Sequence, residues 1–107
     1  MTCNNNVDTI TSDGATIKFN WDDGNRSHLV PHSVTPEEAE QAILDPHAVL
    51  LEIQTGGGEE RTKAMGMTAA GRILTVVFTF RGEAIRPVTA YAATIRLQGL
   101  YLKRRGA

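Results

Sequence analysis

The stretch Ile73-Leu74-Thr75-Val76-Val77-Phe78-Thr79-Phe80-Arg81 decides the fold of this chain, because large apolar side chains alternate in it with smaller or polar ones. Successive side chains of a β-strand point to opposite faces of the sheet. One face of this strand carries Leu74, Val76, Phe78 and Phe80, which are bulky enough to lie beneath helices. The other face carries Ile73, Thr75, Val77, Thr79 and Arg81, and is smaller and more polar. We therefore expect a sheet with one core face and one accessible face.

The segments around this strand extend it into an antiparallel sheet. Apolar segments at 48–53, 64–68 and 85–90 are separated from it and from each other by glycine-containing turn signals at 56–58, 70–71 and 81–83. Such short connections favour antiparallel hairpins over crossovers. Pro87 has no N–H to donate, so its strand is expected at an edge of the sheet or next to a bulge.

Upstream, the sequence predicts a hairpin and two helices. The segments 7–10 and 15–19 flank Asp13-Gly14, a pair that is typical of hairpin turns. The region 21–32 has room for a short helix, which Pro31 would end. Thr35 and Glu38 then form a capping box with Pro36 at the first helical position, which predicts a helix over 36–44.

The last segment, 92–104, predicts a helix with Ala93, Leu97, Leu100 and Tyr101 on one face. Its final turn carries Lys103, Arg104 and Arg105, which suit the negative end of the helix dipole and equally suit contact with nucleic acid. The sequence leaves both interpretations open.

Length and composition indicate one soluble domain. The chain has 107 residues, of which 41% are hydrophobic and 21% charged. We expect a single domain over 1–107, with residues 1–6 as a flexible polar tail. Cys3 is the single cysteine, so the core must form without an internal disulfide. No apolar run approaches the roughly 18 residues of a membrane span and the start lacks a signal-peptide pattern, so a cytoplasmic location is expected.

Charge is divided unevenly along the chain. Residues 1–60 hold eleven acidic and two basic residues, whereas residues 61–107 hold nine basic residues and one acidic residue. This asymmetry has two interpretations. Part of the surface meets a polyanion, or the two halves neutralise each other across the fold.

Several short motifs, in a fixed order, resemble the BrnT family of toxins. A first group of motifs lies around the two predicted helices, and a second group lies along the predicted sheet and the last helix. They are Trp21-Asp22, Asn25, His32, Val34 and Pro36-Glu37-Glu38-Ala39, and then Gly66, Gly71-Arg72, Val76-Val77-Phe78-Thr79, Arg81-Gly82, Ile85-Arg86, Ala90, Ala93, Thr94 and Tyr101. The resemblance covers about residues 17–101. The chain departs from the family pattern at Pro31, where a basic residue is usual, and at Tyr91, where an arginine is usual.

The resemblance implies an α+β, RelE-like fold, in which a small antiparallel meander carries helices on one face and an RNA site on the other. It also implies a ribonuclease toxin of a type II toxin–antitoxin pair. The implied partners are an RNA substrate and an antitoxin of the ribbon-helix-helix type, with DNA reached only indirectly through the antitoxin.

Cleavage of RNA without a metal needs a group that takes the proton from the ribose 2′-OH, cations that stabilise the phosphorane, and an acid for the leaving 5′-oxygen. Arginine suits the cationic role because its planar fork binds two phosphate oxygens. Arg81 and Arg86 flank one turn and are the expected catalytic arginines. Histidine is the side chain suited to exchange protons near neutral pH, so His32 is the expected catalytic acid or base. Arg61, Tyr91 and Arg96 are the expected contacts to substrate.

The sequence predicts no cofactor. His28 and His32 have a metal-ligand spacing only on a continuous helix, which Pro31 interrupts, and no third ligand is near. Gly56-Gly57-Gly58 lacks the Lys-Ser/Thr of a phosphate-binding loop, so a hairpin loop is expected there.

Three functions follow from the sequence. The first is an endoribonuclease toxin that acts through Arg81, Arg86 and His32. The second is a catalytically weakened or inactive toxin-like domain that binds an antitoxin or RNA, which the acidic first half and the departures at Pro31 and Tyr91 favour. The third is an unrelated small α+β domain.

Overall fold

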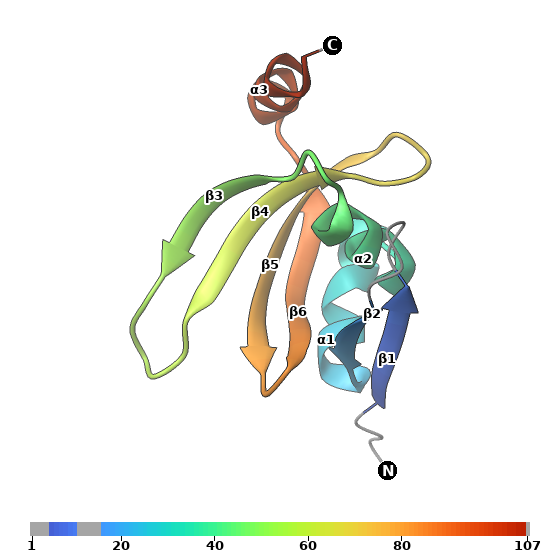
Figure 1. The fold of residues 1–107 in the computed structure, drawn as a ribbon, viewed down its shortest axis with the longest axis vertical. Coiled ribbons are helices and arrows are strands. Elements are labelled where there is room, and N and C mark those ends of the chain that lie inside the picture. The colour runs from blue at the N-terminus through green and yellow to red at the C-terminus, as the bar shows by residue number, and fades with distance from the viewer. Residues whose placement is uncertain (1–4, 11–15, 107) are drawn as a thin grey trace.

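The described part of the chain forms a six-stranded, mostly antiparallel sheet (Figure 1). The computed structural model describes residues 5–10 and 16–106. In chain order the elements are β1 (Asn5–Ile10), β2 (Thr16–Trp21), α1 (Asp23–Leu29), the 3₁₀ turn η1 (Val30–His32), α2 (Pro36–Leu44), β3 (Val49–Gln54), β4 (Arg61–Met67), β5 (Ile73–Arg81), β6 (Ala84–Ala92) and α3 (Ile95–Arg105). The sheet order is β1-β2-β6-β5-β4-β3. The predicted α+β fold with an antiparallel meander over β3 to β6 is confirmed.

One pair of strands differs from the expected all-antiparallel sheet. β2 runs parallel to β6, with Phe19 opposite Ile85. The two strands are far apart in sequence, and the long connection through the helices and the meander returns the chain in the same direction. A parallel pair needs such a connection, and the short turns from which we predicted the sheet carry no signal for it.

The N-terminal hairpin is present, because β1 pairs with β2 in an antiparallel register from Asn5 opposite Trp21 to Ile10 opposite Thr16. Asn5 and Asn6, which the prediction placed in a flexible tail over 1–6, belong to this strand. The rest of that tail, residues 1–4, and the predicted Asp13-Gly14 turn lie outside the described residues.

The helix predicted over 36–44 coincides with α2. The Thr35 side chain accepts a hydrogen bond from the backbone N–H of Glu38, and the Glu38 carboxylate accepts one from the backbone N–H of Thr35. This reciprocal pair is the predicted capping box, and it satisfies two donors that a helix start otherwise leaves unpaired.

The helix expected within 21–32 is α1, and its N-terminal cap and Pro31 explain where it begins and ends. Asp22 caps α1 and shares a second capping box with Asn25. At Pro31 the α-helix has already given way to η1, because proline cannot donate the hydrogen bond that an α-helix interior needs.

α1 occupies the place beside β6 where β2 has ended. The amide Nδ2 of Asn25 donates to the carbonyl oxygens of Asn20, at 2.9 Å, and of Pro87, at 2.8 Å. These bonds satisfy carbonyls at the point where the strand ladder stops, so a buried asparagine replaces a sheet neighbour.

The sequence predicted that Pro87 lies on an edge strand or next to a bulge, and the structure shows the bulge. β6 is an interior strand, but its register to β5 shifts between the pairs Val77–Thr89 and Phe78–Pro87, which leaves Val88 as the extra residue of a bulge. The missing N–H of Pro87 therefore falls where the ladder is already interrupted.

Two apolar clusters hold the helices on the sheet. The larger one joins Leu74 and Val76 of β5 to Phe19, Trp21, Leu29, Val34, Ala39, Ala42 and Ala90. The bulky face of β5 therefore packs under the helices as predicted, except at its end, where Phe80 is 58% exposed. The second cluster contains Met65, Ile73, Ala93 and Tyr101, and it attaches α3 at the end of the sheet (Figure 1).

The two oppositely charged halves of the chain meet in the fold. The described ion pairs each join an acid from residues 1–60 to a base from residues 61–107: Asp22–Arg86, Glu38–Arg72, Glu52–Lys63, Glu59–Arg61 and Glu59–Arg81. Neutralisation across the fold therefore accounts for part of the asymmetry. None of the described helices has the length and apolar character to cross a membrane.

A candidate RNA-binding pocket on the accessible face

The face of the sheet opposite α2 carries the polar side chains of the central strands. The register places Thr79 of β5 across from Arg86 of β6, and Thr75 across from Tyr91. Directly paired residues share a face, so Arg86 and Tyr91 lie on the same side as Thr75 and Thr79. This face, which we call the accessible face, contains most of the candidate site residues, but the exposure expected along β5 is wrong for Ile73, Thr75 and Thr79, which are buried.

A pocket of about 240 Å³ gathers three of the predicted arginines. α1 contributes Gly24, Asn25 and His28, the β3–β4 hairpin contributes Glu59 and Arg61, and the β5–β6 hairpin contributes Arg81, Arg86 and Val88. Arg61, Arg81 and Arg86 are thus brought together from two hairpins. The bulge in β6 adds Val88 to the wall, so the strand irregularity forms part of the pocket.

Arg86 is firmly held at the inner wall. Its Nη1 donates to Asn20 Oδ1 at 2.7 Å and to Asp22 Oδ2 at 2.9 Å, and its Nη2 donates to Asp22 Oδ1 at 3.3 Å. The side chain is 16% exposed. The hydrogen bond from Arg86, helped by the backbone N–H of Asn25, holds the pKa of the Asp22 carboxyl below its ordinary value. Arg86 therefore ties β6 to the start of α1.

Arg61 and Arg81 are far more accessible, with side chains 50% and 53% exposed. Both face the carboxylate of Glu59, which lies 4.0 Å from Arg61 Nε and 3.6 Å from Arg81 Nη2. The hydroxyl of Thr79 donates to the carbonyl oxygen of Glu60 at 2.7 Å and fixes the start of β4 across from β5. This bond keeps the two arginines on one side of the sheet.

His32 and Tyr91 form a second feature of the same face. Their ring centroids are 5.7 Å apart and their planes are tilted by 53°. Neither residue lines the arginine pocket. Arg96 is exposed on α3 and also lies outside the pocket. The structure therefore divides the predicted site residues into an arginine pocket, an aromatic pair and one separate residue.

Two pocket residues were missed from the sequence. His28 was considered only as a metal ligand, although its place on the last turn of a short helix after β2 directs it toward the pocket. Glu59 follows the glycine turn and carries no signal of its own, because only the hairpin register brings it beside Arg61 and Arg81. Within residues 5–10 and 16–106, no three histidine, cysteine, aspartate or glutamate side chains gather as a metal site would require.

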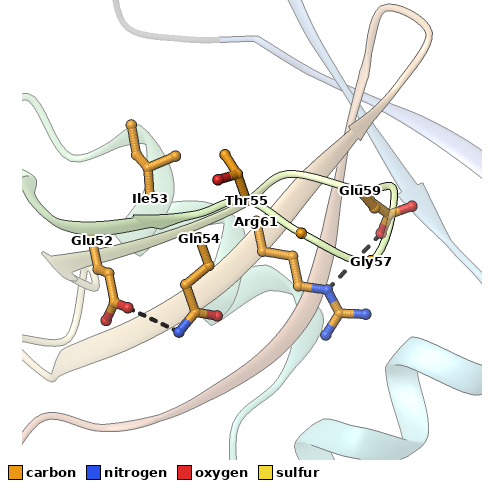
Figure 2. Close-up of a pocket in the computed structure, with 8 residues that line it drawn as sticks. Glu52, Ile53, Gln54, Thr55, Gly57, Glu59 and Arg61 are labelled. Atoms are coloured by element: carbon orange, nitrogen blue, oxygen red, sulfur yellow. Dashed lines mark hydrogen bonds and ion pairs between the residues drawn. The ribbon is translucent and has the colours of Figure 1, made fainter.

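The end of the β3–β4 hairpin forms a second, shallower hollow of about 670 Å³, which shares Glu59 and Arg61 with the arginine pocket. Figure 2 shows Glu52, Gln54 and Arg61 on one side of this hairpin and Ile53 and Thr55 on the other. The loop contains Gly56, Gly57 and Gly58, all with positive φ, and is the hairpin loop predicted from the sequence.

A mostly antiparallel sheet with helices on it and arginines on its accessible face defines a small α+β protein. The comparison with family models is consistent with this class: residues 21–96 match the model described as "Ribonuclease toxin, BrnT, of type II toxin-antitoxin system". The chain belongs to the BrnT family. A search of curated proteins found no match.

Family membership has direct consequences. Members of the family are ribonuclease toxins, and a type II toxin has a cognate antitoxin as its partner. All residues that line the arginine pocket, from Gly24 to Val88, lie inside the matched segment.

Proposed function

We propose that this chain is a metal-independent endoribonuclease that cleaves RNA by attack of a ribose 2′-OH on the adjacent phosphate. The observation that carries the proposal is the pocket that combines Arg61, Arg81 and Arg86 with His28. Several guanidinium groups around one small hollow suit a phosphate whose charge increases in the transition state.

Each group has a proposed role. Arg81 and Arg61 contact the phosphate oxygens, and Arg86 adds positive charge from the inner wall while Asp22 holds it in place. A histidine exchanges protons with the 2′-OH or with the leaving 5′-oxygen. The pocket favours His28 for this role over His32, because His28 lines the pocket and His32 lies against Tyr91.

Tyr91 and His32 are proposed to bind a flanking nucleotide. Their tilted rings lie on the face that contains the pocket, and aromatic side chains bind unpaired RNA bases by stacking. Arg96 remains a candidate for a more distant phosphate contact, outside the pocket. We further propose a ribbon-helix-helix antitoxin as the partner, which brings the chain to DNA only indirectly.

Cleavage of labelled single-stranded RNA by the purified chain in EDTA tests the proposal. We expect products with 2′,3′-cyclic phosphate and 5′-hydroxyl ends, and no cleavage at a position with a 2′-deoxyribose. Arg81→Ala should lower the rate by about 10²-fold or more. Lys18→Ala, which removes the same charge from an exposed position of β2 outside the arginine pocket, is the control and should leave the rate unchanged. Equal rates for wild type and Arg81→Ala would contradict the proposal.

A second function is favoured by one observation. The fork of Arg86 is already engaged by Asp22 and Asn20, and both other arginines face Glu59. A pocket neutralised in this way also suits a domain that binds RNA or an antitoxin without cleaving RNA. The same assay separates the two functions, since a binding domain would retain RNA and leave it intact.

A further inference from the structure

Among the residues that the structure describes, Glu59 is the one carboxylate that lines the arginine pocket. Its two oxygens face different arginines: Oε1 lies 4.0 Å from Arg61 Nε, and Oε2 lies 3.6 Å from Arg81 Nη2. Figure 2 shows the first of these pairs at the bend of the hairpin. A carboxylate that divides its two oxygens between two guanidinium groups has the arrangement in which a phosphodiester would bind them.

We propose that Glu59 occupies a phosphate-binding position between Arg61 and Arg81, and that an RNA phosphodiester displaces it on binding. The inference rests on the proposed function, because it specifies where the RNA phosphate binds in the same pocket. In the free protein the carboxylate neutralises the two most accessible arginines of the pocket. The contact is therefore autoinhibitory for RNA binding.

The ion pairs of Glu59 are weak enough to be exchanged. Strong charge-assisted hydrogen bonds have donor–acceptor distances of about 2.7–2.9 Å, and both Glu59 distances are longer. The Glu59 side chain is 38% exposed, so water competes for it in either position. Exposed ion pairs of this kind contribute little to stability, so separating Glu59 from the two arginines costs little.

The backbone next to Glu59 also permits movement. Gly56, Gly57 and Gly58 precede it with φ values of 134°, 63° and 84°, and no neighbouring atom lies within 4 Å of the position of a Cβ at any of them. By contrast, the carbonyl of Glu60 is fixed by Thr79. The loop can therefore carry Glu59 away from the arginines while Arg61, on the strand that follows, stays in place.

The test measures binding of a fluorescent single-stranded RNA that carries 2′-O-methyl groups throughout and so resists cleavage. Glu59→Gln removes the negative charge with little change in shape, and should tighten binding about three- to tenfold at low ionic strength. The gain should shrink at high salt, because counterions screen the charges. Glu60→Gln changes the net charge equally on the neighbouring residue and should leave the affinity at its wild-type value.

Further variants keep the inference separate from the proposed function. Arg61→Ala and Arg81→Ala should each weaken RNA binding, and Glu59→Gln should no longer tighten it when Arg61 and Arg81 are both alanine. If the arginine variants bind RNA as well as wild type, the proposed function fails. If they bind weakly but Glu59→Gln has wild-type affinity, only the present inference fails. Loss of cleavage by Glu59→Gln with unchanged binding would also overturn it, and would make Glu59 a proton acceptor.

Discussion

At the scale of single residues, two histidines four positions apart occupy different parts of the accessible face. His28 lines the arginine pocket, whereas His32 contacts the ring of Tyr91 beyond it. Pro31 and the 3₁₀ turn separate their environments, because the helix that would place both on one face ends at Leu29. The assignment of the proton-transfer role depends on this difference.

The two histidines form a matched pair for mutagenesis. His28→Gln should lower the RNA cleavage rate by about 10²-fold, the lower end of what general acid–base catalysis contributes. His32→Gln should instead weaken RNA binding a few-fold and leave the rate at saturating RNA near wild type. Single-turnover cleavage at several RNA concentrations separates the two effects. The opposite result, with the rate lost in His32→Gln, would return the catalytic role to His32.

Arg86 also stabilises the fold, and this limits the use of its variants as probes of catalysis. Arg86→Ala removes the two hydrogen bonds to the Asp22 carboxylate and the one to Asn20 Oδ1, and should lower the free energy of unfolding by about 2 kcal/mol. Arg81→Ala, at a side chain 53% exposed, should change it by less than about 0.5 kcal/mol. Urea unfolding at pH 7 measures both. Equal stability of the two variants would contradict this stabilising role of Arg86.

The Asp22–Arg86 pair also predicts a pH dependence. The pKa of Asp22 is lowered in the folded state, chiefly by the hydrogen bond from Arg86, so folding favours the ionised carboxylate. The resulting stability is present above the ordinary aspartate pKa of about 3.9 and is lost as the pH falls through the lower folded value. Between pH 5 and pH 2, wild type should lose more stability than Arg86→Ala. Parallel curves for the two proteins would contradict this.

At the scale of elements, α2 approaches β4 so closely that a side chain is excluded. A Cβ on Gly66 would lie 1.9 Å from the carbonyl oxygen of Ala42 in α2. The carbonyl belongs to the backbone of α2 and a Cβ is fixed to the backbone of β4, so no side-chain rotation can relieve this clash. The close approach explains why a glycine stands in the middle of a strand, where it otherwise weakens the structure.

Two glycine substitutions with opposite outcomes test the packing of the helices. Gly66→Ala should cost about 3 kcal/mol or more, or prevent folding, because α2 must move away from the sheet. Gly99→Ala, in α3 where the added methyl group would meet no atom within 4 Å apart from its own helix backbone and adjacent residues, should stabilise by about 0.5–1 kcal/mol through helix propensity. Thermal unfolding followed by circular dichroism measures both. A stable Gly66→Ala protein would show that α2 does not pack as described.

At the scale of the whole molecule, the elements set by local chemistry were predictable and the contacts between distant segments were not. The capping box of α2 and the alternation in β5 lie within a few residues, so their positions follow from the sequence. The pair Asp22–Arg86 spans 64 positions, and the parallel contact of β2 with β6 spans a similar distance. Both depend on the complete topology.

The candidate site shows the same division. Arg81 and Arg86 flank one short turn, so their proximity was predictable, whereas Arg61 was only a further candidate by its chemistry and the hairpin register places it beside them. The positions of Glu59 and His28 in the pocket were not predictable, because a hairpin register and a helix packed against β6 bring them there. The sequence left open whether the uneven charge forms a charged surface or is neutralised across the fold. The structure shows that each described ion pair joins the acidic half of the chain to the basic half.

The most direct test of the central claim is induced expression of the chain in a bacterial host that lacks its antitoxin, with growth and RNA 5′ ends followed together. We predict growth arrest and new RNA ends with 5′-hydroxyl groups for wild type, and normal growth with intact RNA for Arg81→Ala at an equal level of folded protein. Normal growth and intact RNA with folded wild-type protein would contradict the claim, and would leave the binding function in its place.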